Sequence, residues 1–325
     1  MKPAPTPIAW SVHGLMLAIA IAFPFIFSSP FMVNFGVLAL FYAFIGQSWN
    51  IAGGFAGQLS FGHVVFFGAG AYASTILQVR FGFNPWLGLP ASALAGAFVG
   101  WIIGYLSFRA GLKGSYFALI TLAFAEVLRI VANSLEITGG GLGLLIPAKA
   151  SAANFQFPER IGFYFTMLAL VVVSIAIAIW LKHSRFGAQL AAIRENEDAA
   201  RALGIDVFSE KLKILVISGA LGGMGGCFFA QYFLYIDPII VFGVDKSVEM
   251  LLVSMIGGAG TIYGPLIGAV LLAAVSDGAR LITNVQGLSL VIYGSLLVLI
   301  IAFLPNGLID LVQRITRRKT KKTQS

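Results

Sequence analysis

The chain alternates between long apolar stretches and short polar connections along almost its whole length. We place apolar segments near residues 8–28, 31–50, 63–79, 86–107, 115–132, 162–181, 213–235, 247–275 and 287–304. A helix of about 20 residues crosses the roughly 30 Å hydrocarbon layer of a membrane. We therefore expect an all-α polytopic membrane protein with about 8–10 transmembrane helices, folded as one transmembrane domain over residues 1–325.

Glycine-rich sequence interrupts this pattern twice. The segment at 247–275 contains "GGAGTIYGPLIG", and "NIAGGFAGQLSFGHVVFFGAGAY" joins the second segment to the third. Helices break inside a membrane only where the freed backbone groups are buried in protein or line a wet cavity. We therefore expect glycine-broken or re-entrant segments at both places. The candidate pathway residues there are Gly53, Gly57, Gln58, His63, Gly257, Gly258 and Gly260.

The two interruptions resemble each other weakly, with three glycines at nearly the same spacing in each. Corresponding breaks in two halves predict an internal repeat, and in transporters such breaks often flank the pathway. Small residues also let membrane helices pack closely. The pattern alone favours neither a pathway nor packing.

The positions of Lys and Arg predict the orientation of the segments. Cationic residues collect in the connection at 108–114, in the loop at 182–212 and in the tail at 305–325. Short loops rich in Lys and Arg stay on the cytoplasmic side. We therefore expect these three regions and the C-terminus inside and residues 133–160 outside. An even number of crossings must then join residue 213 to residue 305, so the segment at 247–275 has to be broken.

Composition narrows the functional class. Hydrophobic residues make up 58% of the chain, and the formal net charge is +8. Six basic residues against Asp310 give the tail +5 of that charge. A polybasic end beside a membrane is attracted to anionic lipids, and no interleaved aromatics suggest stacking on bases. The charge therefore indicates topology and membrane lipids, and we expect no nucleic-acid partner.

Motifs of catalytic and metal sites are missing from the sequence. Cys227 is the lone cysteine and lies in an apolar stretch, so neither a disulfide framework nor a thiol metal site can form. No phosphate-binding loop, HExxH sequence or nucleophile elbow occurs. We expect no catalytic residues, no metal and no cofactor, and hence no enzymatic activity in this chain.

A few ionisable residues lie inside apolar segments, where each costs several kcal/mol unless it is paired. Glu126 and Arg129 are three residues apart on one helical face. A structural ion pair is the favoured interpretation, with a place for Glu126 in the pathway as the alternative. His63 stands beside the first glycine interruption. It either lines a pathway or, as we favour, bonds a freed backbone carbonyl.

The sequence "LAAIRENEDAARALGID" at residues 190–206 carries six charges. We predict a helix over 188–203 that ends at Gly204, where a left-handed cap is preferred. Arg194 with Asp198, and Glu197 with Arg201, would pair four residues apart on its polar side. Leu190, Ile193, Ala200 and Leu203 would form the apolar side. A solvated loop helix with internal ion pairs would have the same pattern.

Within this segment, "DAARALG" at residues 198–204 resembles the EAA-xxx-G signature of importer permeases driven by ATP-binding-cassette (ABC) subunits, with Asp in place of Glu. The family's downstream I-x-L-P is replaced by "ILVI" at residues 214–217. Five blocks, "GGFAGQLSFGHVVFFGAGAYAS", "KGSYFALITLAFAEVLRIVANS", "ITGGGLGL", "RFGAQLAAIRENEDAARALGI" and "MIGGAGTIYGPLIGAVLL", follow in the order of the LivM-type branched-chain amino acid permeases. The chain therefore resembles that family over residues 50–275.

This resemblance implies a permease domain in the bacterial inner membrane that works with partner proteins. These are a LivH-type sister permease, two ABC ATPase subunits and a periplasmic substrate-binding protein that delivers an amino acid. The cytoplasmic helix that docks on the ATPase would carry Ala192, Arg194, Glu195, Glu197, Asp198, Ala199, Ala200, Arg201 and Gly204. The binding protein would contact the external segment, at Thr138, Gly139, Gly140 and Gly143.

Other cargoes and mechanisms stay open from the sequence. Related permeases for urea and short amides share much of the same pattern. An ion-coupled secondary transporter or a channel would need no ATPase partner, so co-purification with nucleotide-binding subunits separates both from an importer.

Overall fold

The computed structural model describes residues 7–282, 291, 294–295, 298 and 308, and this part of the chain is almost entirely helical. Its elements are α1 (Pro7–Ile26), α2 (Pro30–Asn50), the π-helical turn η1 (Ile51–Phe55), α3 (Val64–Val79), α4 (Pro85–Arg109), α5 (Gly114–Ser134), the 3-10 turns η2 (Glu136–Thr138) and η3 (Gly140–Leu142), β1 (Leu144–Leu145), the 3-10 turn η4 (Ala152–Asn154), α6 (Arg160–His183), α7 (Arg185–Glu195), α8 (Glu197–Ala202), α9 (Val207–Phe233), β2 (Tyr235–Ile236), α10 (Pro238–Phe242), α11 (Val244–Gly257) and α12 (Gly264–Ile282).

Eight of the nine predicted apolar segments correspond to these helices. Within the described residues, five helices have the length and apolarity to cross a membrane: Pro30–Phe55, Pro85–Arg109, Gly114–Ser134, Arg160–His183 and Val207–Phe233. The predicted break in 247–275 is confirmed, because α11 ends at Gly257 and α12 begins at Gly264. The segment at 287–304 and the tail at 305–325 lie almost wholly outside the described residues.

Local sequence explains where several of these helices begin. Ser29 accepts a hydrogen bond from the Met32 amide and Pro30 follows it, so α2 starts with a side-chain cap and a proline that needs no amide partner. Asn84 and Pro85 repeat this arrangement at α4. The side chain of Ser184 caps α7 at the Gly187 amide. These caps fix the ends of helices whose length is set by their apolar runs.

The centre of the bundle forms where α9 packs against α3 and α4. Glycines permit this packing. A Cβ at Gly70 of α3 would collide with the backbone of Gly223, and one at Gly96 of α4 with the carbonyl oxygen of Gly219. Close approach of small residues is a common way for helices to associate in membranes. Buried aromatic and aliphatic side chains fill the remaining space, with Trp49, Phe44 and Phe66 among the largest.

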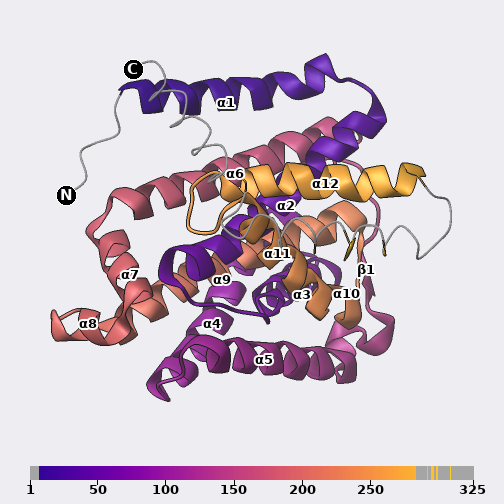
Figure 1. Cartoon of the computed structure of the whole chain (residues 1–325). Helices are drawn as coiled ribbons and strands as arrows, with labels where there is room; N and C mark the ends of the chain where they lie inside the picture. Colours follow the sequence, from indigo (N-terminus) through magenta and orange to yellow (C-terminus); the bar gives the residue numbers. More distant parts are fainter. Residues whose placement is uncertain (1–6, 283–290, 292–293, 296–297, 299–307, 309–325) are drawn as a thin grey trace, which may run out of the picture.

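The bundle has two distinct ends in Figure 1, with α7 and α8 on the left and β1 on the right. We call them the α7–α8 end and the β1–β2 end, since β1 pairs antiparallel with β2. Lys113, before α5, lies 3.0 Å from Asp198 of α8. At the other end Trp86 donates a hydrogen bond to the Ala152 carbonyl (2.8 Å). The connection at 108–114 and the loop at 182–212, both predicted to be cytoplasmic, thus lie at the same end of the bundle. The side of the membrane that this end faces stays a prediction.

Candidate functional site

The first glycine interruption lies where α2 changes its winding. Residues 51–55 form a π-helical turn, and the chain is then irregular until α3 begins at Val64. Gly57 has φ +68°, a left-handed conformation that favours glycine. A Cβ at Gly53 would lie 2.6 Å from the Trp49 ring. Gln58 is buried and donates to the Ala56 carbonyl (2.9 Å), so its side chain stabilises the irregular segment.

The second interruption is the connection between α11 and α12. Gly258 has φ +118° and Gly260 has φ +75°. Gly257 lies so close to the backbone of Gly264 that a Cβ would collide with its carbonyl oxygen. The Thr261 hydroxyl donates to the Gly258 carbonyl (2.7 Å) and accepts from the Gly264 amide (3.0 Å). The turn is therefore specified by its glycines and by one threonine.

The two interruptions touch each other. A Cβ at Gly260 would lie 2.8 Å from the Gly54 carbonyl oxygen. Asn50 joins them through its side chain: its Nδ2 donates to the Thr261 carbonyl (2.9 Å), and its Oδ1 accepts from the Gly260 amide (2.7 Å). We call residues 50–57 and 257–264 together the glycine junction. Asn50 thus bonds one backbone carbonyl and one backbone amide that the break leaves without a helical partner, which the hydrocarbon of a membrane could not do.

Arg194 of α7 reaches this junction from outside the bundle. Its Nη1 donates to the Gly54 carbonyl (2.9 Å). A Cβ at Gly57 would lie 2.7 Å from Arg194 Cγ, and one at Gly260 would lie 2.7 Å from Arg194 Nη1. The predicted charged helix and both predicted glycine interruptions therefore meet at one side chain. Neither this contact nor a role for Asn50 is predictable from the apolar and glycine pattern alone.

The predicted single helix over 188–203 is wrong, because α7 ends at Glu195 and α8 begins at Glu197. Asn196 lies between them, and its Oδ1 accepts from the amides of Asp198 and Ala199 (3.0 Å each). It therefore caps α8 and has the extended conformation usual at a cap. The left-handed conformation predicted for Gly204 is confirmed by its φ of +82°.

The two predicted i,i+4 ion pairs of this segment are absent from the structure. Arg194 lies at the junction and is 3.5 Å from Glu195, while Arg201 lies 3.6 Å from Asp198. The kink at Asn196 separates Arg194 from Asp198. Within α8, Glu197 pairs with Lys211 instead of Arg201. Leu190, Ile193 and Ala200 are buried as predicted. Leu203 is 80% exposed, because α8 has ended before it.

Two lysines from other elements hold α8 instead. Lys211 of α9 lies 2.7 Å from Glu197, and Lys113 lies 3.0 Å from Asp198 and 3.7 Å from Glu197. The hydrogen bond from Lys113 lowers the pKa of the Asp198 carboxyl below its ordinary value. The pair at Lys113 is exposed, and the pair at Lys211 is nearly enclosed. Thus α7 is attached to the glycine junction and α8 to α9.

His63 is fully buried between α2, α3 and α9. Its Nε2 lies 3.0 Å from the Ser48 hydroxyl and 3.3 Å from the Ser218 hydroxyl. Each serine also donates to the backbone carbonyl of the other, at 2.8 and 2.6 Å. The expectation of a bond to a freed carbonyl is wrong in this detail, because the two serine hydroxyls are nearer partners. The cluster links three helices behind the junction.

The remaining predicted residues lie apart from the junction. Glu126 is bonded by Arg129 on α5 at 2.9 and 2.5 Å, which confirms the ion pair, and its side chain is about half exposed. Thr138 is buried at the β1–β2 end and donates to the Ala132 and Leu135 carbonyls (2.5 and 2.6 Å). Three glycines of the same loop have left-handed φ values, namely Gly139, Gly140 and Gly143.

Comparison with known proteins decides the family. Residues 31–301 match the family model described as branched-chain amino acid transport system / permease component. The chain belongs to this family of permeases. It is 30% identical over 322 residues to the LivM permease protein of Salmonella typhimurium, covering 92% of this chain and 74% of that protein.

More distant relatives of this permease include a second type of branched-chain amino acid permease protein and a sugar permease. The LivH permease protein of Escherichia coli is 24% identical over 300 residues, covering 86% of this chain and 94% of that protein. The L-arabinose ABC transporter permease protein AraH of Azospirillum brasilense is 27% identical over 250 residues, covering 76% and 71%. No solved structure matches the permease significantly. The resemblance to LivM-type permeases is confirmed, and the chain is a multi-pass membrane permease of the ABC transporter class.

Proposed function

We propose that this permease is one of two membrane subunits of an ATP-driven importer for branched-chain or similar amino acids. Matches to both LivM and LivH proteins support a partnership with a LivH-type sister permease. Two ABC ATPase subunits and a periplasmic binding protein complete the assembly, which lies in the bacterial inner membrane. The α7–α8 end and the C-terminus face the cytoplasm.

The single observation that carries the mechanism is the hydrogen bond from Arg194 to the Gly54 carbonyl. Helices α7 and α8 dock on an ATPase subunit, and closure of the ATPases on ATP displaces α7. Because Arg194 contacts the backbone of the first interruption and packs against the second, this displacement moves the glycine junction. The junction then opens or closes the inner end of the pathway. Asn50 makes both interruptions move together.

At the opposite end, the loop around η2 and η3 receives the binding protein. The buried Thr138 hydroxyl and the strand pair hold this loop in place. Leu142 and Leu145 are 87% and 72% exposed there, so they offer the apolar contacts that a docking partner would cover. In this arrangement Thr138 and the glycines shape the contact surface, and the leucines make the contact.

The cargo is an amino acid whose opposite charges cancel, so the pathway needs no strong fixed charge. The charged side chain that contacts the glycine junction is Arg194, and its guanidinium donates a hydrogen bond to the Gly54 carbonyl. A short amide or urea would place the same demands on the pathway. Uptake of labelled leucine, isoleucine and valine, with urea and acetamide as competitors, distinguishes these cargoes.

The mechanism is tested by replacing Arg194 in the reconstituted complex. Arg194→Gln removes a hydrogen bond from a charged donor, which contributes about 1.5–3 kcal/mol. We expect amino-acid uptake to fall about tenfold or more, while binding-protein-stimulated ATP hydrolysis persists. Arg194→Lys keeps the charge but lacks the planar, two-nitrogen donor group, so it should restore uptake only in part.

Arg109→Gln is the matched control, because Arg109 is an exposed arginine of α4 that bonds Tyr105 within its own helix and lies outside α7 and α8. It should import at nearly the normal rate. Normal uptake by Arg194→Gln would refute transmission through this contact. Uptake that continues without ATP and stops when an ion gradient is dissipated would instead establish a secondary transporter.

A further inference from the structure

A basic cavity lies at the corner where α6 meets α7, next to the glycine junction. It has a volume of about 640 Å³ and reaches from Leu181 to Phe55 and Gly260. Four of its lining residues are basic, and none is acidic: Lys182, His183, Arg185 and Arg194. Arg194 is committed to the Gly54 carbonyl, whereas the other three stand at the mouth as exposed residues.

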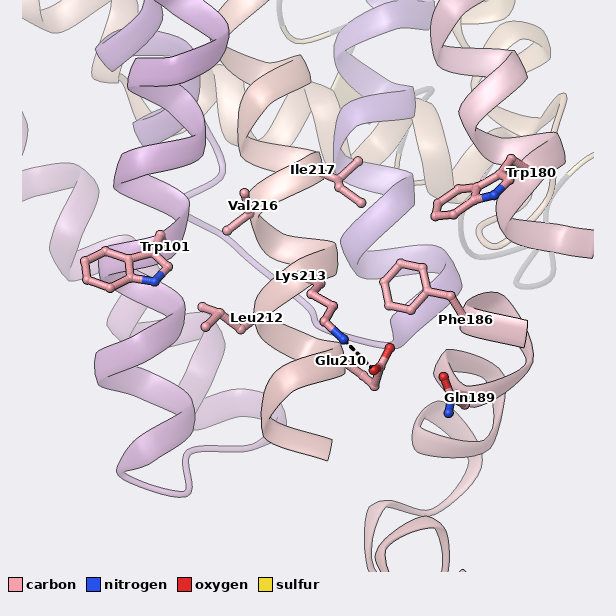
Figure 2. Close-up of a pocket in the computed structure, with 9 residues that line it drawn as sticks. All are labelled: Trp101, Trp180, Phe186, Gln189, Glu210, Leu212, Lys213, Val216 and Ile217. Carbon is pink, nitrogen blue, oxygen red and sulfur yellow. Dashed lines mark hydrogen bonds and ion pairs between the residues drawn. The ribbon is translucent and has the colours of Figure 1, made fainter. Parts of the chain in front are cut away.

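The cations at the mouth differ from the other cations of this end. Lys113, Lys211 and Lys213 each lie within 3.0 Å of a carboxylate oxygen. Figure 2 shows one such pair, Lys213 with Glu210 on α9. In the part of the chain that the structure describes, no hydrogen bond or ion pair involves the side chains of Lys182, His183 or Arg185. The charges of Lys182 and Arg185 are therefore available to an anion.

Two helix ends meet at the cavity, and at the end of α6 the carbonyls of Trp180 and Leu181 accept from the Ser184 amide. Arg185 is the first residue of α7, whose eleven residues place the positive end of the helix dipole at the corner. Only the Gly187 amide of the first turn is taken by the Ser184 side chain. Amides at the start of a helix favour phosphate and other anions. The cavity therefore combines fixed cations, a helix N-terminus and open volume.

The same corner carries the marks of a membrane interface. Trp180, in the last turn of α6, is 52% exposed. Its ring is tilted against that of Phe186 of α7, with ring centroids 5.7 Å apart. In Figure 2 both rings face an open groove between this corner and Trp101 of α4, with a volume of about 610 Å³. Exposed tryptophan at the end of a span is typical of the headgroup level. The basic residues that directly follow Trp180 thus lie where lipid phosphates lie.

We propose that this cavity binds the phosphate headgroup of an anionic phospholipid. A basic pocket at the end of a membrane helix matches such a headgroup both in charge and in its position along the membrane normal. An acidic segment of a partner protein would suit the charge alone, because nothing would place it at the level of Trp180. The bound headgroup lies against Phe55 and Gly260, so its presence stabilises one arrangement of the glycine junction. This effect on transport rests on the proposed function, whereas lipid binding does not.

Lipid binding is measured on the purified full-length chain by native mass spectrometry. Cardiolipin, phosphatidylglycerol or phosphatidylethanolamine is added, and bound lipids are counted. The wild type should retain anionic lipid in preference to phosphatidylethanolamine. The double variant Lys182→Gln/Arg185→Gln should bind anionic lipid about tenfold more weakly, since each basic group near a membrane surface attracts such lipids substantially. It leaves Arg194 untouched.

The matched control, Lys149→Gln/Arg160→Gln, removes two charges at the β1–β2 end and should keep the wild-type lipid count. Equal retention by the cavity variant and the wild type would overturn the proposal. Displacement of the lipid by millimolar inorganic phosphate would also overturn it, because the site would then be selective for a free ion. Unchanged lipid counts with loss of ATPase co-purification would assign the cavity to a protein partner instead.

A second measurement separates this proposal from the transport mechanism. Complexes are reconstituted in phosphatidylcholine vesicles with or without cardiolipin. Cardiolipin should raise uptake by the wild type several-fold and leave the cavity variant unchanged. Lipid binding that is present without any effect on uptake would refute the regulatory part while the binding site stands. Lipid binding would survive a failure of the proposed transport function.

Discussion

At the scale of single residues, the glycines of the junction are required for two separable reasons. Gly57 and Gly260 have positive φ, and a Cβ added at either position would lie 2.7 Å from an atom of the Arg194 side chain. Gly82 has nearly the same φ, +69°, yet a Cβ there would meet nothing within 4 Å. A non-glycine residue would therefore be strained at all three positions, but only at Gly57 and Gly260 would its side chain also be crowded.

This difference gives a matched experiment. Gly260→Ala and Gly57→Ala should each reduce amino-acid uptake about tenfold or more, because the new methyl group displaces Arg194 from the Gly54 carbonyl. Gly82→Ala should cost only the strain of the left-handed conformation, about 1 kcal/mol, and should import normally. Uptake and membrane abundance are measured for all three. If the three variants import equally, crowding at the junction has no part in transport.

The glycines of the junction are predictable from the sequence, whereas the residues that join them are not. Runs of glycine inside apolar segments are visible in one dimension. The contacts of Asn50 and Arg194 join positions 210 and 140 residues apart. A polar residue directly before "IAGG" is the available signal for Asn50, since a buried amide needs partners and freed backbone groups supply them. Nothing in the sequence around Arg194 distinguishes it from a solvent-exposed arginine.

At the scale of elements, the charged segment shows why periodicity can mislead. Its charges recur at helical spacing, so one helix was predicted. Asn196 interrupts it because its side chain offers the next amides an alternative to the preceding turn. The following Glu197 and Asp198 are typical of a first helical turn, so together with Asn196 they are the sequence signal for this break. The result is two short helices with separate attachments.

The attachment of α8 through Lys113 leads to a prediction about charge. Lys113→Glu should loosen α8, and Lys113→Glu/Asp198→Lys should restore most of the protection, because the pair is reversed while Glu197 keeps its partner Lys211. Hydrogen exchange of residues 197–202 measures this. About 1 M salt should raise the exchange in the wild type, since exposed pairs are screened. Lys149→Glu, at the opposite end, should leave these amides unchanged.

The same pair has a defined pH dependence. The hydrogen bond from Lys113 lowers the pKa of the Asp198 carboxyl below its ordinary value. A lowered carboxyl pKa gives stability that is present above the ordinary pKa and lost as the pH falls through the folded-state pKa. Protection of α8, corrected for intrinsic exchange, should therefore be constant from about pH 5 to 8. A marked loss between pH 8 and pH 6 would contradict this pairing as the attachment.

At the scale of the whole molecule, the apolar pattern predicted most of the spans because each one is long and uninterrupted. It also predicted the division of 247–275, through the requirement for an even number of crossings. The order of packing was not predictable. The central position of α9 depends on glycines that meet glycines of α3 and α4, and their partners are far apart along the chain.

Orientation is tested with single cysteines, and the native Cys227 is fully buried and should not react. Ala152→Cys at the β1–β2 end should react with a membrane-impermeant maleimide in intact cells. Leu203→Cys, after α8, should react only once the inner membrane is permeabilised. Labelling of Leu203→Cys in intact cells would reverse the orientation that we assign.

The π-helical turn at the end of α2 sets the register of the first interruption against α7. A π turn holds one residue more than an α turn. If residues 51–55 were rewound as α-helix, every residue beyond them would turn by about 100° around the axis and shift by about 1.5 Å. Gly57 would then face a different neighbour, and the Gly54 carbonyl would turn away from Arg194. The wide turn thus sets the register of the chain beyond it, and adding or removing one residue within 51–55 should break the contact with Arg194.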